Sequence, residues 1–198
     1  PEGTVFNIGF TEDTMGVRPW VLKRVGLYTG ARYTSDGGSD YFETFKPYGA
    51  RFLHINIENA GGPVRLNRYG MISQIYPYPK TGSFTSSDPL LDEIWDMGWR
   101  TLEVCSEDTY TDTPYRERGI YAGDALPQYA IALVGSGDSR LMMRSIRVFA
   151  DMYRDLMIPG EERPDNSVNH MADYPLMTLI TYIWSVARTG DMDFASEF

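Results

Sequence analysis

Residues 111–124 read Thr-Asp-Thr-Pro-Tyr-Arg-Glu-Arg-Gly-Ile-Tyr-Ala-Gly-Asp, a stretch rich in charged and aromatic side chains. These side chains are Asp112, Tyr115, Arg116, Glu117, Arg118, Tyr121 and Asp124. Carboxyl groups are the acids and bases of glycoside cleavage, and aromatic faces suit sugar rings. One interpretation is a carbohydrate site on a loop. The other is a surface loop in which the two arginines form salt bridges with the two aspartates.

The sequence on both sides of this stretch has the spacing of amphipathic helices. Asp88 followed by Pro89 is a favourable helix start, because aspartate caps free N–H groups and proline is tolerated in the first turn. Apolar residues then recur at helical spacing as far as Leu102. Three further helices are predicted, and their approximate limits are 124–134, 138–153 and 176–189. Antiparallel helix pairs joined by loops are the simplest arrangement for these segments.

Caps and apolar stripes support these predicted helices. Asp124 is expected to cap the second helix and Asp138 the third, because aspartate is a favoured N-cap residue. Thr189-Gly190 would end the fourth helix, since glycine tolerates the left-handed conformation found there. The apolar stripe of the fourth helix consists of Leu176, Leu179, Ile180, Ile183, Trp184 and Ala187. These residues share one face of the predicted helix, and the chain by itself is expected to expose apolar helix faces.

The first part of the chain has strand character instead. Residues 51–58 alternate, with Leu53, Ile55 and Ile57 on one face and polar side chains on the other. Turn residues divide the region into short pieces. The candidate strands are 4–10, 25–33, 41–45, 51–58, 64–67 and 70–76. Several short strands with frequent turns predict a β-sandwich, with the boundary to the helical part at 78–82.

Composition narrows the possible functions. The 198 residues carry 18 basic and 27 acidic side chains, a formal net charge of −9, which argues against nucleic acid or an anionic membrane as the partner. One cysteine, Cys105, cannot form an internal disulfide, and with only two histidines no Cys/His metal cluster is expected. Cys105 is expected to be a buried thiol. No apolar run approaches the roughly 20 residues that span a bilayer.

Residues 111–124 also resemble a known family signature. The Asp, Arg-Glu-Arg and Gly-Asp groups of this stretch are similar to those of bacterial α-L-rhamnosidases, inverting glycosidases with a six-hairpin (α/α)6 barrel. The approach at 82–95, with Asp88-Pro89, resembles the linker into the first barrel helix. Asp173-Tyr174 resembles a later barrel loop. The chain departs from the family string at several positions: Thr113, Tyr115, Gly119, Ile120, Tyr121 and Ala122.

The resemblance implies a fold and an organisation in two parts. Residues 1–82 would be the C-terminal part of a β-sandwich domain. Residues 83–198 would be the N-terminal part of the (α/α)6 catalytic domain, with helical hairpins that form an incomplete barrel. The chain is then expected to be a piece of a longer enzyme, with the remainder of the same polypeptide as its partner, and to be inactive alone.

The resemblance also implies the chemistry. Glu117 would be the general acid that protonates the leaving oxygen, and the negative charges of Asp112 and Asp124 would favour its protonated form. The residues expected to bind the sugar are Asp112, Arg116, Tyr121, Asp124 and Asp173. The general base would lie beyond this chain, and neither a cofactor nor a metal is required. The substrate would be a carbohydrate with terminal α-L-rhamnose.

Two alternatives remain open at this point. Tyr115 stands where the family has glutamine and Tyr121 where it has tryptophan, so another (α/α)6 enzyme with a different sugar is the first alternative. A non-catalytic carbohydrate-binding module is the second. The set of three carboxyl groups counts against that second alternative, because a binding module has no need of a general acid. The aglycone, linkage, oligomeric state and compartment are not indicated by the sequence.

Overall fold

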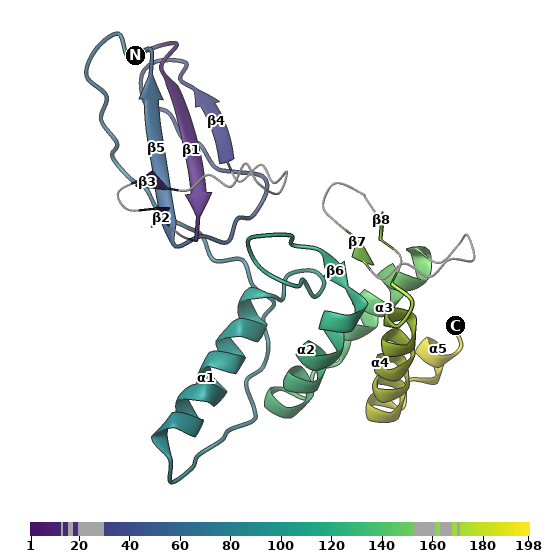
Figure 1. The fold of residues 1–198 in the computed structure, drawn as a ribbon. Helices are drawn as coiled ribbons and strands as arrows, with labels where there is room; N and C mark the ends of the chain where they lie inside the picture. The colour runs from purple at the N-terminus through teal and green to yellow at the C-terminus, as the bar shows by residue number, and fades with distance from the viewer. Residues whose placement is uncertain (13, 16–17, 20–29, 153–160, 163–167, 170) are drawn as a thin grey trace. The chain divides into compact units, whose positions relative to one another are not determined.

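The computed structural model describes residues 1–12, 14–15, 18–19, 30–152, 161–162, 168–169 and 171–198 (Figure 1). The chain divides into two compact units. The first consists of Pro1–Gln74 with the short piece Pro114–Arg116, and the second of Ile75–Thr113 with Glu117–Phe198. The regular elements described in the first unit are strands, whereas the second unit is mainly helical.

A three-stranded antiparallel sheet forms the regular part of the first unit, with β1 between β4 and β5. These strands are β1 Val5–Thr11, β4 Gly30–Thr34 and β5 Phe52–Glu58; β2 (Thr14–Met15) and β3 (Arg18–Pro19) pair separately. The apolar pairs across β1 and β5 are Phe6–Ile57, Ile8–Ile55 and Phe10–Leu53. Apolar residues of both strands therefore share one face. This register confirms the alternation predicted for 51–58.

Three of the predicted strands are wrong. Residues 41–45, 64–67 and 70–76 carry no strand, and most of their side chains are exposed, as Tyr41 is at 78%. β-propensity alone does not make a strand, because the backbone groups also need a partner strand, and water satisfies them in an exposed loop. The predicted strand at 25–33 overlaps β4, although residues 25–29 lie outside the described part. The structure thus shows a small antiparallel sheet, and the β-sandwich stays a prediction.

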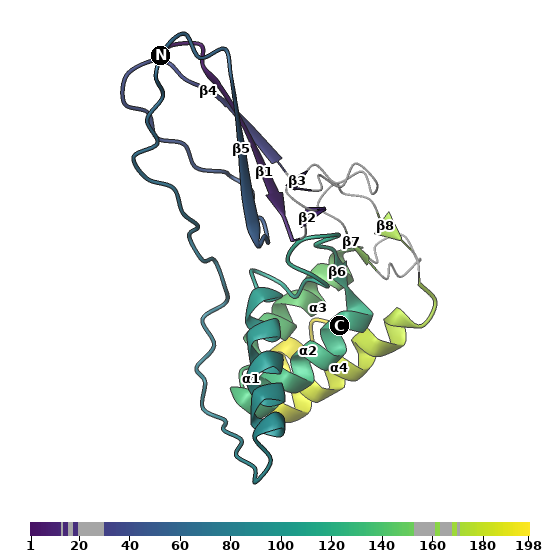
Figure 2. The same ribbon diagram turned by 60° about the vertical axis from the view of Figure 1, so that its left-hand side comes forward.

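The second unit is built from helices and one short sheet. The helices are α1 Pro89–Val104, α2 Ala122–Gly135, α3 Arg140–Met152, α4 Tyr174–Thr189 and α5 Met192–Ala195. The strands are β6 (Ile120–Tyr121), β7 (Glu161–Glu162) and β8 (Val168–Asn169), with β7 in the middle. α2 packs against α1, α3 and α4, and Figure 2 shows α1, α2 and α4 side by side.

Two helix ends agree with the sequence prediction. The carboxylate of Asp88 accepts the N–H of Leu90 at 3.0 Å, and Pro89 is the first residue of α1. α4 ends at Thr189, and Gly190 follows with a φ of +66°. This left-handed conformation is the one that glycine adopts without a steric penalty. Local chemistry thus determines where these helices start and stop.

The predicted cap of α2 is wrong, whereas that of α3 is confirmed. α2 begins at Ala122, so Asp124 lies inside its first turn, and Tyr121 occupies the N-cap position without a side-chain cap bond. The start moves because Tyr121 is held in β6, directly before the helix. Asp138 accepts the N–H of Arg140, the first residue of α3, at 2.9 Å.

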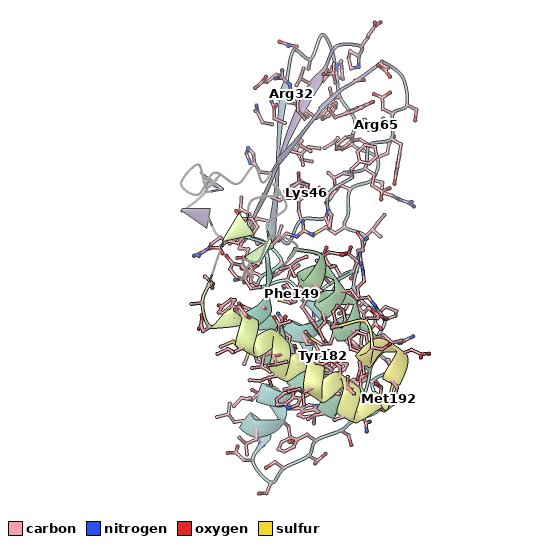
Figure 3. The ribbon with its side chains drawn as sticks, turned by 90° about the vertical axis from the view of Figure 1, so that its right-hand side faces the viewer. Arg32, Lys46, Arg65, Phe149, Tyr182 and Met192 are labelled. Carbon is pink, nitrogen blue, oxygen red and sulfur yellow. The ribbon has the colours of Figure 1, made fainter. Side chains whose placement is uncertain are left out.

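The core of the second unit lies where α1, α2 and α3 meet. Its largest members, each at most 4% exposed, are Trp99, Leu102, Tyr110, Tyr129, Met142, Ile146, Phe149 and Phe194. Gly135 at the end of α2 lies directly against the ring of Trp99, so that a Cβ at this position would collide with the indole. The end of α2 can therefore approach α1 closely. Figure 3 labels Phe149 of α3 and Tyr182 of α4, and Tyr182 packs against this core.

α4 leaves its apolar stripe exposed, as expected, and buries another face. Its buried residues are small and polar, and they are Thr178, Thr181 and Ser185. The hydroxyls of Thr181 and Ser185 donate to carbonyls of their own helix at 2.8 Å, so no polar group is left unpaired when this face packs on α2 and α3. The residues of the apolar stripe are exposed, with Leu176 at 64% and Trp184 at 41%, whereas Tyr182 and Val186 pack against the core.

Candidate active site

The loop between α1 and β6 is closed by hydrogen bonds at two points. At its base, the N–H of Thr111 donates to the carbonyl of Cys105 at 2.9 Å. Further along, the N–H of Asp112 donates to the carbonyl of Gly119 at 3.0 Å, and the N–H of Gly119 donates to the Asp112 carboxylate at 2.8 Å. These two bonds hold residues 112 and 119 together. They therefore fix both ends of the segment that carries Glu117.

Glu117 accepts a hydrogen bond from the hydroxyl of Tyr121. Tyr121 belongs to β6, whose backbone pairs with β7, and its side chain is buried, with 7% exposed. A phenol held by both a strand and its own burial cannot turn away freely. The carboxyl group of Glu117 thus has a partner whose position is set by the sheet.

Asp124 lies on the other side of β6, in the first turn of α2. A negative charge is favoured there by the free N–H groups and the helix dipole. The hydroxyl of Tyr174, the first residue of α4, donates a hydrogen bond to the Asp124 carboxylate. The rings of Tyr174 and Tyr121 meet edge to face, with 6.3 Å between their centroids. Gly123 lies so close to the Tyr174 ring that a Cβ would collide with it, which explains a glycine at this position.

The three carboxyl groups Asp112, Glu117 and Asp124 influence one another's ionisation. Partial burial raises the pKa of Asp112, and the charges of Glu117 and Asp124 add to this, whereas two backbone N–H groups oppose it. Burial also raises the pKa of Asp124; its own N–H and the Tyr174 hydroxyl oppose the rise, and the charge of Glu117 adds to it. Negative charge gathered in a half-buried site favours a protonated carboxyl group within it.

Arg118 forms an ion pair with Glu107, a residue outside the stretch 111–124. The guanidinium Nη2 lies 2.6 Å from the Glu107 carboxylate, and the two side chains are only 12% and 16% exposed. The backbone of Arg118 is left-handed, with a φ of +50°. Both features lie next to Glu117 in the chain.

The structure brings four of the six predicted site residues together, and these are Asp112, Glu117, Tyr121 and Asp124. Arg116 is exposed and belongs to the first unit. Asp173 is exposed and precedes α4, where its side chain makes no cap bond.

Two contacts near the site were not predicted from the sequence. Tyr174 bonds to Asp124, although the prediction named its neighbour Asp173. The signal was an aromatic residue at a helix start beside a predicted site residue. Glu107 has no comparable signal, because its distance from Arg118 along the chain follows no regular spacing.

Cys105 lies beneath this loop as a buried thiol, as predicted. Burial first, and the charges of nearby carboxylates second, raise its pKa to about 11, so it stays protonated at neutral pH. Among the described residues, no group of three or more His, Cys, Asp or Glu side chains is arranged to hold a metal ion. No helix in the described ranges has the length and apolar character needed to cross a bilayer.

Comparison with known proteins indicates the family of the domain that carries these residues. Residues 79–175 match the family model of the bacterial alpha-L-rhamnosidase 6 hairpin glycosidase domain. The chain carries part of a bacterial α-L-rhamnosidase domain. The matched range includes Glu107, Asp112, Glu117, Tyr121, Asp124 and Tyr174. A rhamnosidase-family glycoside hydrolase domain therefore contains the whole carboxylate group described above.

Two solved rhamnosidases share this fold. The crystal structure of a GH78 family rhamnosidase of Bacillus sp. GL1 matches the whole chain with a TM-score of 0.83 and 22% identity, and the chain covers 20% of it. A rhamnosidase from Klebsiella oxytoca with rhamnose bound matches with a TM-score of 0.64 and 18% identity, and the chain covers 41% of it. The chain thus spans less than half the length of either rhamnosidase. No curated protein sequence matches it.

Proposed function

We propose that the protein containing this chain removes terminal α-L-rhamnose from glycosides or polysaccharides, with inversion at the anomeric carbon. The observation that carries the proposal is the group of three mutually interacting carboxyls, Asp112, Glu117 and Asp124, within a rhamnosidase-family domain. An inverting glycosidase needs one carboxyl group that is protonated and one that is ionised. A cluster of acidic groups in a half-buried site supplies the conditions for the first.

Glu117 is proposed as the general acid. It lies between Asp112 and Asp124 in the chain, and its negative charge raises the pKa of both aspartates. The hydroxyl of Tyr121 donates a hydrogen bond to its carboxyl group. Both aspartates have partners that fix their carboxylates, namely the N–H of Gly119 and the hydroxyl of Tyr174. Fixed carboxylate oxygens accept hydrogen bonds from sugar hydroxyls, which is the role proposed for the two aspartates. Substrate contacts are proposed for Tyr121, Arg116 and Asp173 as well.

The second carboxylate of the mechanism is proposed to come from a part of the enzyme outside this chain. In an inverting enzyme it lies about 6.5–9.5 Å from the acid, across the sugar, and activates water. We further propose that residues 83–198 open an (α/α)6 catalytic domain and that residues 1–82 end a β-sandwich domain. The exposed apolar side chains of α4 support the first part of this proposal, because a helix face of this kind is normally covered by another helix.

A different sugar is the second candidate. It is favoured by Tyr121, whose hydroxyl is bound to Glu117, whereas the family string has tryptophan at this position. The same buried ring then offers a different surface to the substrate. Aryl glycosides of several sugars, supplied to the full-length protein, separate this candidate from a rhamnosidase. Sugar binding without turnover of any of them indicates a binding module.

The test of the main proposal combines product stereochemistry with one substitution. Proton NMR of the full-length enzyme acting on an α-L-rhamnoside should show β-L-rhamnose as the first product. Glu117→Gln should lower kcat on a natural rhamnoside by about 10²–10⁴-fold, because general acid catalysis contributes about that much, while rhamnose binding by calorimetry persists. Full turnover in Glu117→Gln contradicts the assignment of the acid, and α-L-rhamnose as first product contradicts inversion.

A further inference from the structure

The backbone at Arg118 has a conformation that side chains with a Cβ seldom adopt. Its φ of +50° lies in the left-handed region, which is strained for residues other than glycine, asparagine and aspartate. Arg118 lies directly between Glu117 and Gly119, whose N–H is bound to Asp112. The turn at Arg118 therefore sets the direction in which Glu117 leaves the loop. Such a conformation persists only where other contacts hold it.

The ion pair with Glu107 is the contact that can hold this turn. Glu107 lies in the short turn after α1 that is closed by the β-bridge between Ser106 and Tyr110. The pair is 2.6 Å long, and both of its side chains are mostly buried, at 12% and 16% exposed. Water therefore competes with it less than with an exposed pair, which makes it a firmer restraint. It ties the turn after α1 to the residue that follows Glu117.

We propose that Glu107 and Arg118 are positioning residues for the general acid. The pair stabilises the left-handed turn at Arg118, and that turn presents the Glu117 carboxyl group to the hydroxyl of Tyr121 and to the glycosidic oxygen. The inference rests on the proposed role of Glu117, and it adds two residues that act through the backbone of the acid. Loss of the pair loosens the acid and leaves the carboxylates of Asp112 and Asp124 in place.

Two substrates distinguish a misplaced acid from a damaged protein. An alkyl α-L-rhamnoside needs a proton on its leaving oxygen, whereas 2,4-dinitrophenyl α-L-rhamnoside releases an anion that is stable without one. Glu107→Gln in the full-length enzyme should lower kcat on the alkyl substrate by about 10–100-fold, a part of what general acid catalysis contributes. On the dinitrophenyl substrate kcat should stay close to that of the wild type. KM should stay unchanged on both substrates, because the groups that bind the sugar are intact.

Variants of Arg118 test the same contact from the other side. Arg118→Gly removes the ion pair and also relieves the strain of the left-handed turn, so it keeps the experiment informative if Glu107→Gln does not fold. It should show a smaller selective loss on the alkyl substrate than Glu107→Gln, because glycine adopts the left-handed turn without the ion pair. Arg118→Lys keeps the charge opposite Glu107 and should restore much of the lost activity. A positive charge at position 118 is therefore expected to affect kcat only on substrates whose leaving group needs a proton.

Glu197→Gln provides the matched control. It breaks the pair between Arg147 and Glu197, which has the same 2.6 Å separation but is far more exposed, at 43% and 39%. The ratio of the two activities should not change in this variant. An equal loss on both substrates in Glu107→Gln and Arg118→Gly, or no loss on either, overturns the positioning role while the function of Glu117 stands. A wild-type enzyme without rhamnosidase activity, or insensitive to Glu117→Gln, overturns the proposed function and this inference with it.

Discussion

The hydroxyl of Tyr121 donates a hydrogen bond to the carboxyl group of Glu117, four residues earlier in the chain. The phenol reaches this position because Tyr121 lies in β6 and its ring is packed edge to face against Tyr174. Tyr174 in turn bonds to Asp124. Two tyrosines therefore connect the proposed acid to one of the carboxylates proposed to bind the sugar.

Tyr121→Phe should lower kcat on alkyl rhamnosides by about tenfold or more. The carboxyl group of Glu117 becomes charged as it gives its proton to the leaving oxygen, and a hydrogen bond to a charged group contributes about 1.5–3 kcal/mol. Each 1.4 kcal/mol is a factor of about ten in rate. Tyr121→Trp is the matched variant, because it keeps a large ring and restores the residue of the family string. Steady-state kinetics of the full-length enzyme measures both. If Tyr121→Phe keeps the wild-type kcat, the hydrogen bond does not help to position the acid.

Gly123→Ala should destabilise the protein and lower its activity. The new methyl group would collide with the Tyr174 ring and push it away from Asp124. Overpacking costs about 1–3 kcal/mol, more than the gain of about 1 kcal/mol from replacing a helical glycine by alanine. Thermal unfolding of the full-length protein measures the difference.

Gly98→Ala in α1 is the control for this substitution, because a Cβ there meets no atom within 4 Å. It should raise the unfolding temperature by the amount expected for helix propensity alone. Equal effects of the two substitutions would show that the contact between Gly123 and Tyr174 is unimportant.

Asp124→Asn should stabilise the protein at neutral pH. Burial raises the pKa of Asp124, so its protonated form is favoured in the folded state. The resulting stability is present below the unfolded pKa and is lost as the pH rises through the folded pKa. Asparagine avoids that loss and still accepts the Tyr174 hydroxyl bond. We expect about 0.5–1 kcal/mol at pH 7, a small value because the carboxyl is only half-buried.

The control for Asp124→Asn is pH itself. Unfolding midpoints at about pH 3 should be nearly equal for the variant and the wild type, since Asp124 is then mostly protonated in both states. A gain of the same size at both pH values would mean that the charge of Asp124 is not its cause.

Asp138→Asn should have the opposite pH dependence. Hydrogen bonds from the Arg140 guanidinium lower the pKa of Asp138, and the N–H of Arg140 and the hydroxyl of Tyr76 also contribute. The stability from this carboxylate is present above its unfolded pKa and is lost as the pH falls through the folded pKa. Asparagine keeps an oxygen for the N–H of Arg140 but removes the charge that pairs with its guanidinium. The variant should therefore lose about 0.2–1 kcal/mol at pH 7, as expected for a partly exposed ion pair, and progressively less below about pH 4. Denaturant unfolding across this pH range tests it, and a loss independent of pH contradicts it.

Several features of the fold could be predicted because they depend on neighbours in the chain. The start of α1 at Asp88-Pro89 and the end of α4 at Gly190 follow from capping chemistry. The alternation of β5 follows from the period of a strand. The strands expected at 41–45, 64–67 and 70–76 failed because a strand also needs a partner, which no local pattern supplies.

The residues of the candidate site could also be predicted in part. Asp112, Glu117 and Asp124 stand at a spacing typical of the family, and Tyr121 lies among them. The bond of Tyr174 to Asp124 was not predicted, because Tyr174 reaches this carboxylate from another helix. Glu107 was missed because its ion pair with Arg118 depends on how the loop is folded.

The sequence by itself determined which side chains are available for chemistry and where most helices begin and end. These properties depend on side-chain type and on neighbours three or four residues away. Only the tertiary structure decided that Tyr121 bonds to Glu117, that Arg118 pairs with Glu107, and that α4 buries its small polar face. Each of these contacts depends on the path that the backbone takes between the two residues. Close packing of whole helices and strands sets that path, and no regular spacing in the sequence indicates it.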